Sequence, residues 1–118
     1  RKDDTVYVKL ADVAEAKKDF DAASKYLKRA LEIEEKKPAR FARLSDLLLK
    51  IGANDEAFEA IQKSVEFESE NPKYLDKFIE ISIIVGNKKL ANKALTQLTK
   101  VNADNNKLEQ FKEKIANI

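Results

Sequence analysis

The stretch DEAFEAIQKSV, residues 55–65, contains the alanine around which the rest of the chain is organised, Ala57. Similar stretches lie 34 residues before and after it, DAASKYLKRAL at 21–31 and KLANKALTQLT at 89–99, with Ala23 and Ala91 at the matching place. In each copy a Leu or Ile follows the alanine by four residues, and Ala, Ser or Leu follows after three more. This spacing is one face of an α-helix, and a small residue there lets a second helix approach closely. Three copies at one period predict a repeat protein.

Each repeat is predicted to hold two helices joined by a short turn. First helices are expected near 4–17, 38–51 and 72–85, and second helices near 20–35, 54–69 and 88–102. The buried stripes of the first helices are Tyr7, Leu10, Ala11, Ala14; Phe41, Leu44, Ser45, Leu48; and Leu75, Phe78, Ile79, Ser82. Those of the second helices are Phe20, Ala23, Leu27, Ala30, Leu31, Ile33; Ala57, Ile61, Ser64, Val65, Phe67; and Ala91, Leu95, Leu98, Val101. Because the turns are short, consecutive helices must run antiparallel.

Helix start and stop signals support these boundaries. Pro38 and Pro72 stand where a first helix begins, a place where the missing N–H is tolerated. Gly52 and Gly86 stand where a first helix ends and the left-handed conformation is favoured, whereas the first repeat has Lys18 there, which predicts a turn that is either strained or differently closed. The expected N-capping residues are Asp19, Asn54, Asn71 and Asn87.

The whole chain, residues 1–118, is predicted to form one domain. Its repeats are 4–37, 38–71 and 72–105, and residues 106–118 form a final helix with Leu108, Phe111, Ile115 and Ile118 on one stripe. A helix with one apolar face and one charged face is what the end of a repeat array requires, because it covers the last repeat. We therefore expect 106–118 to be a capping helix.

The composition favours a helical protein and excludes several kinds of chemistry. The chain has 118 residues, 43% hydrophobic and 37% charged, with only two Gly and two Pro. It has no Cys and no His, which removes disulfides, nucleophilic pairs based on His and nearly every zinc site. No phosphate-binding loop or metal-loop motif is present. We expect no enzyme activity, no cofactor and no metal.

The charges are balanced overall but uneven along the chain. The net charge is +2, with +1 over residues 1–37, −3 over 38–71 and +4 over 72–118. Lysines 88, 89, 93 and 100 have no aromatic residues among them on which bases could stack, so nucleic-acid binding is not expected. No run is apolar enough to span a bilayer and no signal-peptide pattern is present. Because the chain opens Arg1-Lys2 without Met, we expect an excised domain or a processed product. We also expect a cytoplasmic location.

The repeat pattern resembles the tetratricopeptide repeat, a 34-residue pair of helices. Tyr7-Leu10-Ala11 with Ala23-Leu27-Ala30 fits its signature well, Phe41-Leu44-Ser45 with Ala57-Ile61-Ser64 nearly as well, and Leu75-Phe78-Ile79 with Ala91-Leu95-Leu98 less well. The signature proline is absent, since Glu35, Ser69 and Ala103 occupy its place. The resemblance implies an all-α, right-handed α-solenoid that acts as a non-enzymatic scaffold. Pentatricopeptide and HAT-type repeats, which bind RNA or scaffold RNA-processing complexes, are related alternatives, but the period favours the tetratricopeptide form.

The resemblance also implies a concave groove, lined by the first helices, that binds an extended peptide or a partner helix. Nine side chains, called the groove residues below, are the candidates: Lys9, Asp12, Arg43, Asp46, Leu49, Lys73, Lys77, Glu80 and Ile83. The basic column at positions 9, 43 and 77 precedes the acidic column at 12, 46 and 80 by three residues, so we expect each base to pair with the acid on its own helix. Such pairs either neutralise the surface or hold the charges of a bound peptide.

Two further predictions concern what the groove binds. Some family members grip a terminal carboxylate with Lys and Asn side chains; here Val8 and Asp12 stand at the first-repeat places and Arg43 replaces an Asn, so we predict no such clamp although Lys73 and Lys77 are present. In the third repeat Ile83 and Ile84 lie off the buried stripe and Ile81 is marginal. Either the capping helix covers this apolar surface, or it binds a partner or a second copy of the chain.

Overall fold

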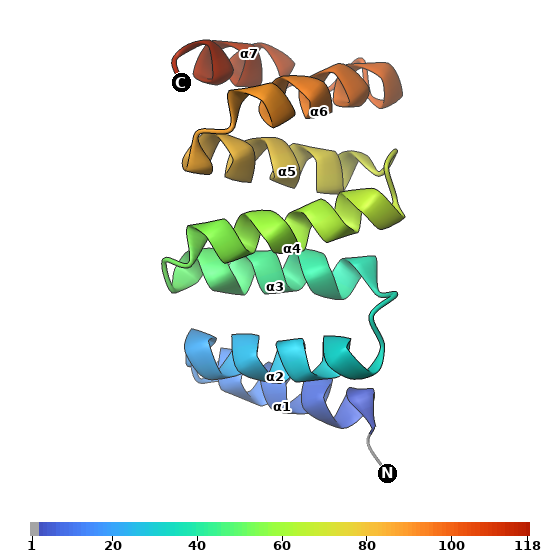
Figure 1. Ribbon diagram of the computed structural model, residues 1–118, viewed down its shortest axis with the longest axis vertical. Helices are drawn as coiled ribbons and strands as arrows, with labels where there is room; N and C mark the ends of the chain where they lie inside the picture. The colour runs from blue at the N-terminus through green and yellow to red at the C-terminus, as the bar shows by residue number, and fades with distance from the viewer. Residues whose placement is uncertain (1–2) are drawn as a thin grey trace.

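The computed structural model describes residues 3–118, and over that range the chain forms seven α-helices. They are α1 (Asp4–Ala16), α2 (Phe20–Ile33), α3 (Pro38–Lys50), α4 (Asn54–Phe67), α5 (Pro72–Val85), α6 (Lys88–Val101) and α7 (Leu108–Ala116). Figure 1 shows them stacked in chain order along the long axis of a body measuring 46 × 25 × 21 Å. Each helix packs against its neighbours in the chain, and α7 also reaches α5. This quasi-one-dimensional packing is that of an α-solenoid, as predicted.

The helix starts follow the sequence signals at all but one position. Pro38 and Pro72 are the first residues of α3 and α5. The side chains of Asp19, Asn71 and Asn87 accept hydrogen bonds from backbone N–H groups of the helices that follow. The prediction for Asn54 was wrong: it is the first residue of α4, and Ala53, which makes no side-chain bond, has the capping position. The reason is register, because 19, 53 and 87 are one repeat apart and the middle repeat carries an alanine there.

The three turns between first and second helices share one geometry. Backbone N–H groups of Asp19, Ala53 and Asn87 donate to the carbonyl oxygens five residues earlier at 2.9, 2.9 and 2.8 Å. The residue before each donor has a left-handed backbone: φ is +78° at Gly52 and Gly86 and +61° at Lys18. Lys18 is thus a lysine in a glycine position, as the sequence predicted, and the first turn carries backbone strain that the other two lack.

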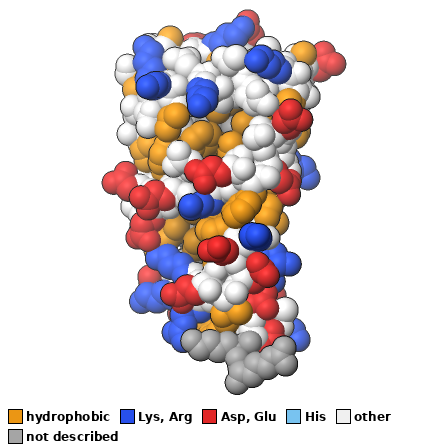
Figure 2. Space-filling model, turned by 45° about the vertical axis from the view of Figure 1, so that its right-hand side comes forward, with side chains coloured by type: hydrophobic (Ala, Val, Ile, Leu, Met, Phe, Trp, Pro, Cys, Tyr) orange, Lys and Arg blue, Asp and Glu red, His pale blue; other side chains and the backbone are white. Residues whose placement is uncertain are grey.

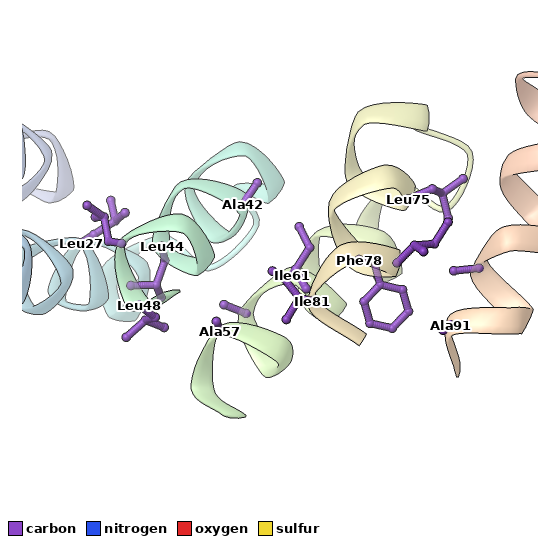
Figure 3. Close-up of a cluster of buried hydrophobic side chains, with 14 of the residues drawn as sticks. Leu27, Ala42, Leu44, Leu48, Ala57, Ile61, Leu75, Phe78, Ile81 and Ala91 are labelled. Atoms are coloured by element: carbon purple, nitrogen blue, oxygen red, sulfur yellow. The ribbon is translucent and has the colours of Figure 1, made fainter. Parts of the chain in front are cut away.

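The columns of small residues lie at the centre of the helix packing. Ala11, Ala23, Ala57 and Ala91 are fully buried. Larger side chains fill the space between successive pairs: in Figure 3 Ile61 of α4 points toward Ile81 of α5, while Leu75 and Phe78 of α5 point toward α6, where Ala91 lies. One continuous core therefore runs along the stack rather than closing on itself.

Burial at one repeat position, that of residues 13, 47 and 81, depends on whether a preceding repeat covers it. Leu47 and Ile81 are 1% and 0% exposed, because α2 packs on α3 and α4 packs on α5. The equivalent residue of α1, Val13, is 53% exposed, since no described helix covers that side of α1. Leu47 was absent from the predicted core and Ile81 was considered marginal. Val13, with Val6 and Leu10, forms the α1 seam, three exposed apolar side chains on one face of that helix.

The ends of the second helices and the capping helix also differ from prediction. Ile33 and Phe67 were expected to be buried but are exposed, because they close the last turn of α2 and α4, where the chain leaves the helix. Phe67 keeps one contact, a stacked arrangement with Phe41 at 6.2 Å between ring centroids. The final helix is shorter than predicted: Phe111 and Ile115 are buried as expected, whereas Ile118 lies beyond α7 and is exposed.

Candidate interaction surfaces

The charged groove residues pair between helices rather than within them. The Arg43 guanidinium of α3 lies 2.7 Å from Asp12 Oδ1 and 2.9 Å from Glu15 Oε1, both on α1. Lys77 Nζ of α5 lies 2.7 Å from Asp46 Oδ1 of α3. The predicted pairing of each base with the acid three residues later was therefore wrong at Arg43 and Lys77. Neighbouring first helices lie near enough for each base to reach back to the preceding one, so these bases already have partners before any ligand arrives.

Two more ion pairs extend this pattern along the first helices. Arg40 Nη1 lies 2.7 Å from Asp4 Oδ2, and Lys107 Nζ lies 3.4 Å from Asp76 Oδ1, which ties the start of α7 to α5. In three of these pairs the base follows its acid by 31 residues: Asp12 and Arg43, Asp46 and Lys77, Asp76 and Lys107. That spacing was visible in the sequence and was missed. Because the side chains are partly exposed, each pair contributes about 1 kcal/mol or less to stability.

The surroundings shift the pKa of three groups near these pairs. Partial burial opposes the charge of Arg43, but hydrogen bonds to Glu15 and Asp12 outweigh it and raise its pKa. A hydrogen bond from Arg40 lowers the pKa of Asp4. Partial burial and the neighbouring Asp76 carboxyl raise the pKa of Glu80, against the opposing charges of Lys107 and Lys77. The ionised form of Glu80 is therefore disfavoured in the fold.

The remaining groove residues are two free bases and two apolar side chains. Lys9 and Lys73 are exposed, and neither makes an ion pair within the described part of the chain. Leu49 and Ile83, one repeat apart, are half-buried and pack against the edge of the core. Glu15 occupies their place in α1 and binds Arg43. In the third repeat, Ile84 is 52% exposed whereas Ile81 is buried, so only part of the predicted apolar surface reaches solvent.

A second surface, which the sequence did not reveal, lies between successive second helices. The α4–α6 cleft has a volume of about 700 Å³ and is floored by α5. Its lining residues are Gln62, Val65, Glu66, Ser69, Leu75, Phe78, Leu90, Lys93, Ala94, Thr96, Gln97 and Lys100. The α2–α4 cleft, floored by α3, has about 220 Å³ and is lined by Lys28, Phe41, Leu44, Leu48, Glu56, Glu59, Ala60 and Lys63.

The two clefts are equivalent positions of successive repeats, and their differences explain their sizes. Seven of the eight residues that line the smaller cleft have a counterpart 34 residues later in the larger one. Lys28 and Glu56 bridge the smaller cleft with an ion pair of 2.8 Å. Their counterparts, Gln62 and Leu90, cannot form an ion pair. The α4–α6 cleft therefore stays open over an apolar floor.

The rest of the surface offers few other candidates. In Figure 2 charges of both signs are interspersed on the visible face, with apolar side chains exposed between them. Among residues 3–118, acidic side chains form no group of three or more that could hold a metal ion. None of the helices in that range combines the length and apolar character needed to cross a bilayer.

Comparison with known proteins agrees with this architecture. No curated protein sequence matches the chain. The MamA protein crystal structure has a TM-score of 0.78 at 20% identity, covering 98% of this chain and 72% of that one. The complex of the TPR2B domain of yeast Sti1 with pHsp70 has a TM-score of 0.77 at 15% identity, covering 97% and 96%. The first TPR of Spaghetti (RPAP3), bound to the HSP90 peptide SRMEEVD, has a TM-score of 0.79 at 10% identity, covering 97% and 90%.

Likeness at such low identity establishes the fold alone, and the family model matches the first repeat. Residues 4–37 match the model of the tetratricopeptide repeat family. The next two helix pairs repeat the same turn geometry and the same buried alanine column. The first repeat, residues 4–37, thus matches the tetratricopeptide repeat family, and the chain as a whole has the fold of tetratricopeptide repeat proteins, with three helix pairs and a final helix.

Proposed function

We propose that the chain is a non-enzymatic interaction module that binds an extended peptide or a partner helix against the groove residues. The observation that carries the proposal is the pair Leu49 and Ile83. These two apolar side chains recur one repeat apart, half-exposed, beside a surface otherwise rich in charge. Similar folds in Sti1 and Spaghetti were solved with a bound pHsp70 and a bound HSP90 peptide, which supports peptide binding as the use of this fold.

The ion pairs indicate which of the basic groove residues are already held in place and which are free to bind a ligand. Arg43 and Lys77 are held in place by acids of the preceding helix, so they lose little side-chain entropy when a ligand arrives. Lys9 and Lys73 are free to bind acidic side chains of a ligand. Leu49 and Ile83 supply apolar surface, and a ligand gains free energy by covering it. We therefore expect a ligand with an apolar anchor and flanking acids.

A grip on a terminal carboxylate is not part of this proposal. Val8 has no donor to offer, Asp12 would repel a carboxylate, and Arg43 is already bound to Asp12 and Glu15. A synthetic SRMEEVD peptide and the same peptide with an amidated C-terminus should therefore bind this chain equally weakly. A clear preference for the free carboxylate in fluorescence anisotropy would mean that a clamp exists.

A pair of variants tests the groove directly. Leu49→Glu copies Glu15 of the first repeat, and Lys73 is exposed, so the double variant Leu49→Glu with Lys73→Glu should keep its fold. Peptides selected from a random display library against the wild-type chain should bind this variant at least tenfold more weakly. Lys36→Glu with Lys114→Glu, two exposed lysines outside the groove residues, is the control and should bind normally. Unchanged affinity of the groove variant would show that Leu49 and Lys73 do not take part in binding.

Self-association is a second candidate, favoured by the α1 seam. Val6, Leu10 and Val13 expose a stripe whose counterparts in the second and third repeats are largely buried or charged. The third-repeat surface is weaker, because only Ile84 is well exposed there. If the seam joins two copies, the wild-type chain should form a dimer in light scattering and Val13→Glu should be monomeric. A wild-type chain that stays monomeric at about 1 mM would exclude this candidate.

A further inference from the structure

The α4–α6 cleft lies on the other side of α5 from the groove residues. Its floor consists of Leu75 and Phe78, whereas Lys73, Lys77 and Glu80 are groove residues of the same helix. At 100° per residue, the centres of these two stripes are about 160° apart around the helix axis. A molecule in the cleft would therefore leave the groove free, and the cleft is a separate candidate site that goes beyond the proposed function.

The cleft has the shape of an apolar socket. Leu75 and Phe78 are almost fully buried at its floor, and Val65 and Leu90 line its walls half-buried. The Phe78 ring is held by Phe58 of α4, with 5.3 Å between ring centroids, so the floor is already formed without a ligand. A volume of about 700 Å³ accepts one or two large side chains of a partner.

The charge on the rim is positive and unpaired. Lys93 and Lys100 line the cleft and are exposed, and neither makes an ion pair with any described residue. Glu66 is the one acid in the lining, and it lies 3.8 Å from Lys63. Lys93 and Lys100 are seven residues apart on α6, which places them on one face, about 10 Å apart along the axis. Two free ammonium groups thus stand beside an apolar socket.

The equivalent α2–α4 cleft indicates which features matter. There Glu59 stands in place of Lys93, and Lys28 and Glu56 close the opening. An acidic ligand would be repelled by Glu59 and excluded by the ion pair. The α4–α6 cleft has neither the acidic residue nor the bridging ion pair. It can therefore accept an acidic ligand that the α2–α4 cleft rejects.

We propose that the α4–α6 cleft binds a short, extended acidic segment of a partner protein that inserts one large apolar side chain between two carboxylates. Charge complementarity carries the choice of occupant, because the unpaired charges at the rim are those of two lysines. In an extended chain alternate side chains share a face, so carboxylates two residues before and after the inserted one lie on its side of the chain, about 13 Å apart. Flexible lysine side chains from positions about 10 Å apart reach both carboxylates.

The test compares the open cleft with a closed one. Gln62→Lys with Leu90→Glu, the closed variant, recreates the Lys28–Glu56 ion pair in the second cleft and keeps a combination that the fold already contains. A random dodecapeptide library is selected on the wild-type chain after depletion on the closed variant. The recovered peptides should carry a large apolar residue flanked by Asp or Glu. They should bind the closed variant at least tenfold more weakly, and binding to the wild type should weaken as NaCl is raised.

A second pair of variants keeps the test decisive if the closed variant folds poorly. Lys93→Glu with Lys100→Glu changes only exposed side chains and should also lose tenfold or more in affinity. Lys88→Glu with Lys89→Glu, on the same helix but outside the lining, should bind as the wild type does. Amide chemical shifts should change on α4, α5 and α6 for these peptides, whereas groove peptides should change α1, α3 and α5.

Several outcomes would overturn the proposal. Depletion that leaves no binding peptide, or peptides without acidic residues, would show that the cleft has no such ligand. Recovered peptides that bind the Lys93→Glu with Lys100→Glu variant as tightly as the wild type would place the binding elsewhere. A wild-type dimer that dissociates in the closed variant would show that the cleft binds a second copy of the chain instead of an acidic segment. Loss of cleft binding leaves the groove proposal intact, because each set of peptides is tested with its own variants.

Discussion

Replacing Lys18 by Gly should stabilise the protein, because Lys18 occupies a left-handed turn that Gly52 and Gly86 occupy in the other repeats. A side chain with a Cβ in this conformation costs roughly 1–2 kcal/mol. Glycine also raises the conformational entropy of the unfolded chain, which offsets about 0.4–1 kcal/mol of the stability gained by removing the Cβ. The net expected increase in the free energy of unfolding is about 1 kcal/mol, or roughly 4 °C in Tm for a chain of this length.

The reverse change should have the opposite effect for the same reason. A Cβ built at Gly86 has no heavy atom within 4 Å, so Gly86→Lys meets no steric obstacle and loses only the backbone preference, about 1 kcal/mol. Lys17→Gly is the matched control, since Lys17 has φ of −85° and removal of its side chain should destabilise the end of α1 by about 0.5–1 kcal/mol. Lys18→Ala separates the loss of charge from the change in backbone.

Thermal unfolding followed by circular dichroism at 222 nm, with urea titration as a second measurement, orders the four variants. The expected order of stability is Lys18→Gly above wild type, Lys18→Ala close to wild type because it keeps the Cβ, and Lys17→Gly and Gly86→Lys below it. If Lys18→Gly were no more stable than Lys17→Gly, the first turn would not hold the left-handed conformation in solution. The equivalence of the three turns would then be wrong at the first repeat.

Three further predictions follow from burial and charge. Leu47→Ala should lose about 2–5 kcal/mol of stability in urea titration, whereas Val13→Ala, at the equivalent exposed position, should change it by less than about 0.5 kcal/mol; similar losses would mean that α1 is covered in solution. Ser82 Oγ is buried without a hydrogen-bond partner, so Ser82→Ala should raise Tm, with a gain of about 1 kcal/mol, and a loss would show that the hydroxyl is satisfied. Because the pKa of Glu80 is raised in the fold, ionised Glu80 opposes folding, so its unfavourable contribution grows as pH rises above the unfolded value. Glu80→Gln should therefore stabilise the chain near neutral pH and leave its stability unchanged near about pH 3, and an equal effect at both pH values would contradict this.

The repeat architecture could be predicted because it is written in local spacing. Ala23, Ala57 and Ala91 define a period, and caps and turn residues recur with it, so helix pairs and their order follow from residues close together in the chain. Asn54 was misassigned because it is a residue of the N-capping type that stands next to Ala53, and only comparison with positions 19 and 87 shows that Ala53 has the capping place.

Burial and pairing across repeats could not be predicted from a single helix. Leu47 lies off the stripe that faces its own second helix and is buried because α2 packs on its other side. Arg43 has an acid three residues later on its own helix, yet it binds Asp12 and Glu15 of the preceding first helix. Both errors have one cause: helical spacing describes the face of one helix, whereas the solenoid decides what lies opposite that face.

The same comparison of equivalent positions explains why the open surfaces lie toward the C-terminal half. At the first junction, between the first and second repeats, Glu15 binds Arg43 on one face and Lys28 binds Glu56 on the other, so an ion pair covers each face. At the second junction, between the second and third repeats, Leu49 occupies the position equivalent to Glu15, and Leu90 the position equivalent to Glu56. Each of these apolar side chains reaches the surface where the first junction has an ion-paired acid. Partly exposed ion pairs add about 1 kcal/mol or less to stability. At the second junction the Asp46–Lys77 pair remains, but the counterparts of the Glu15–Arg43 and Lys28–Glu56 pairs are absent and Leu49 and Leu90 reach the surface there; a partner gains most where it covers such apolar area.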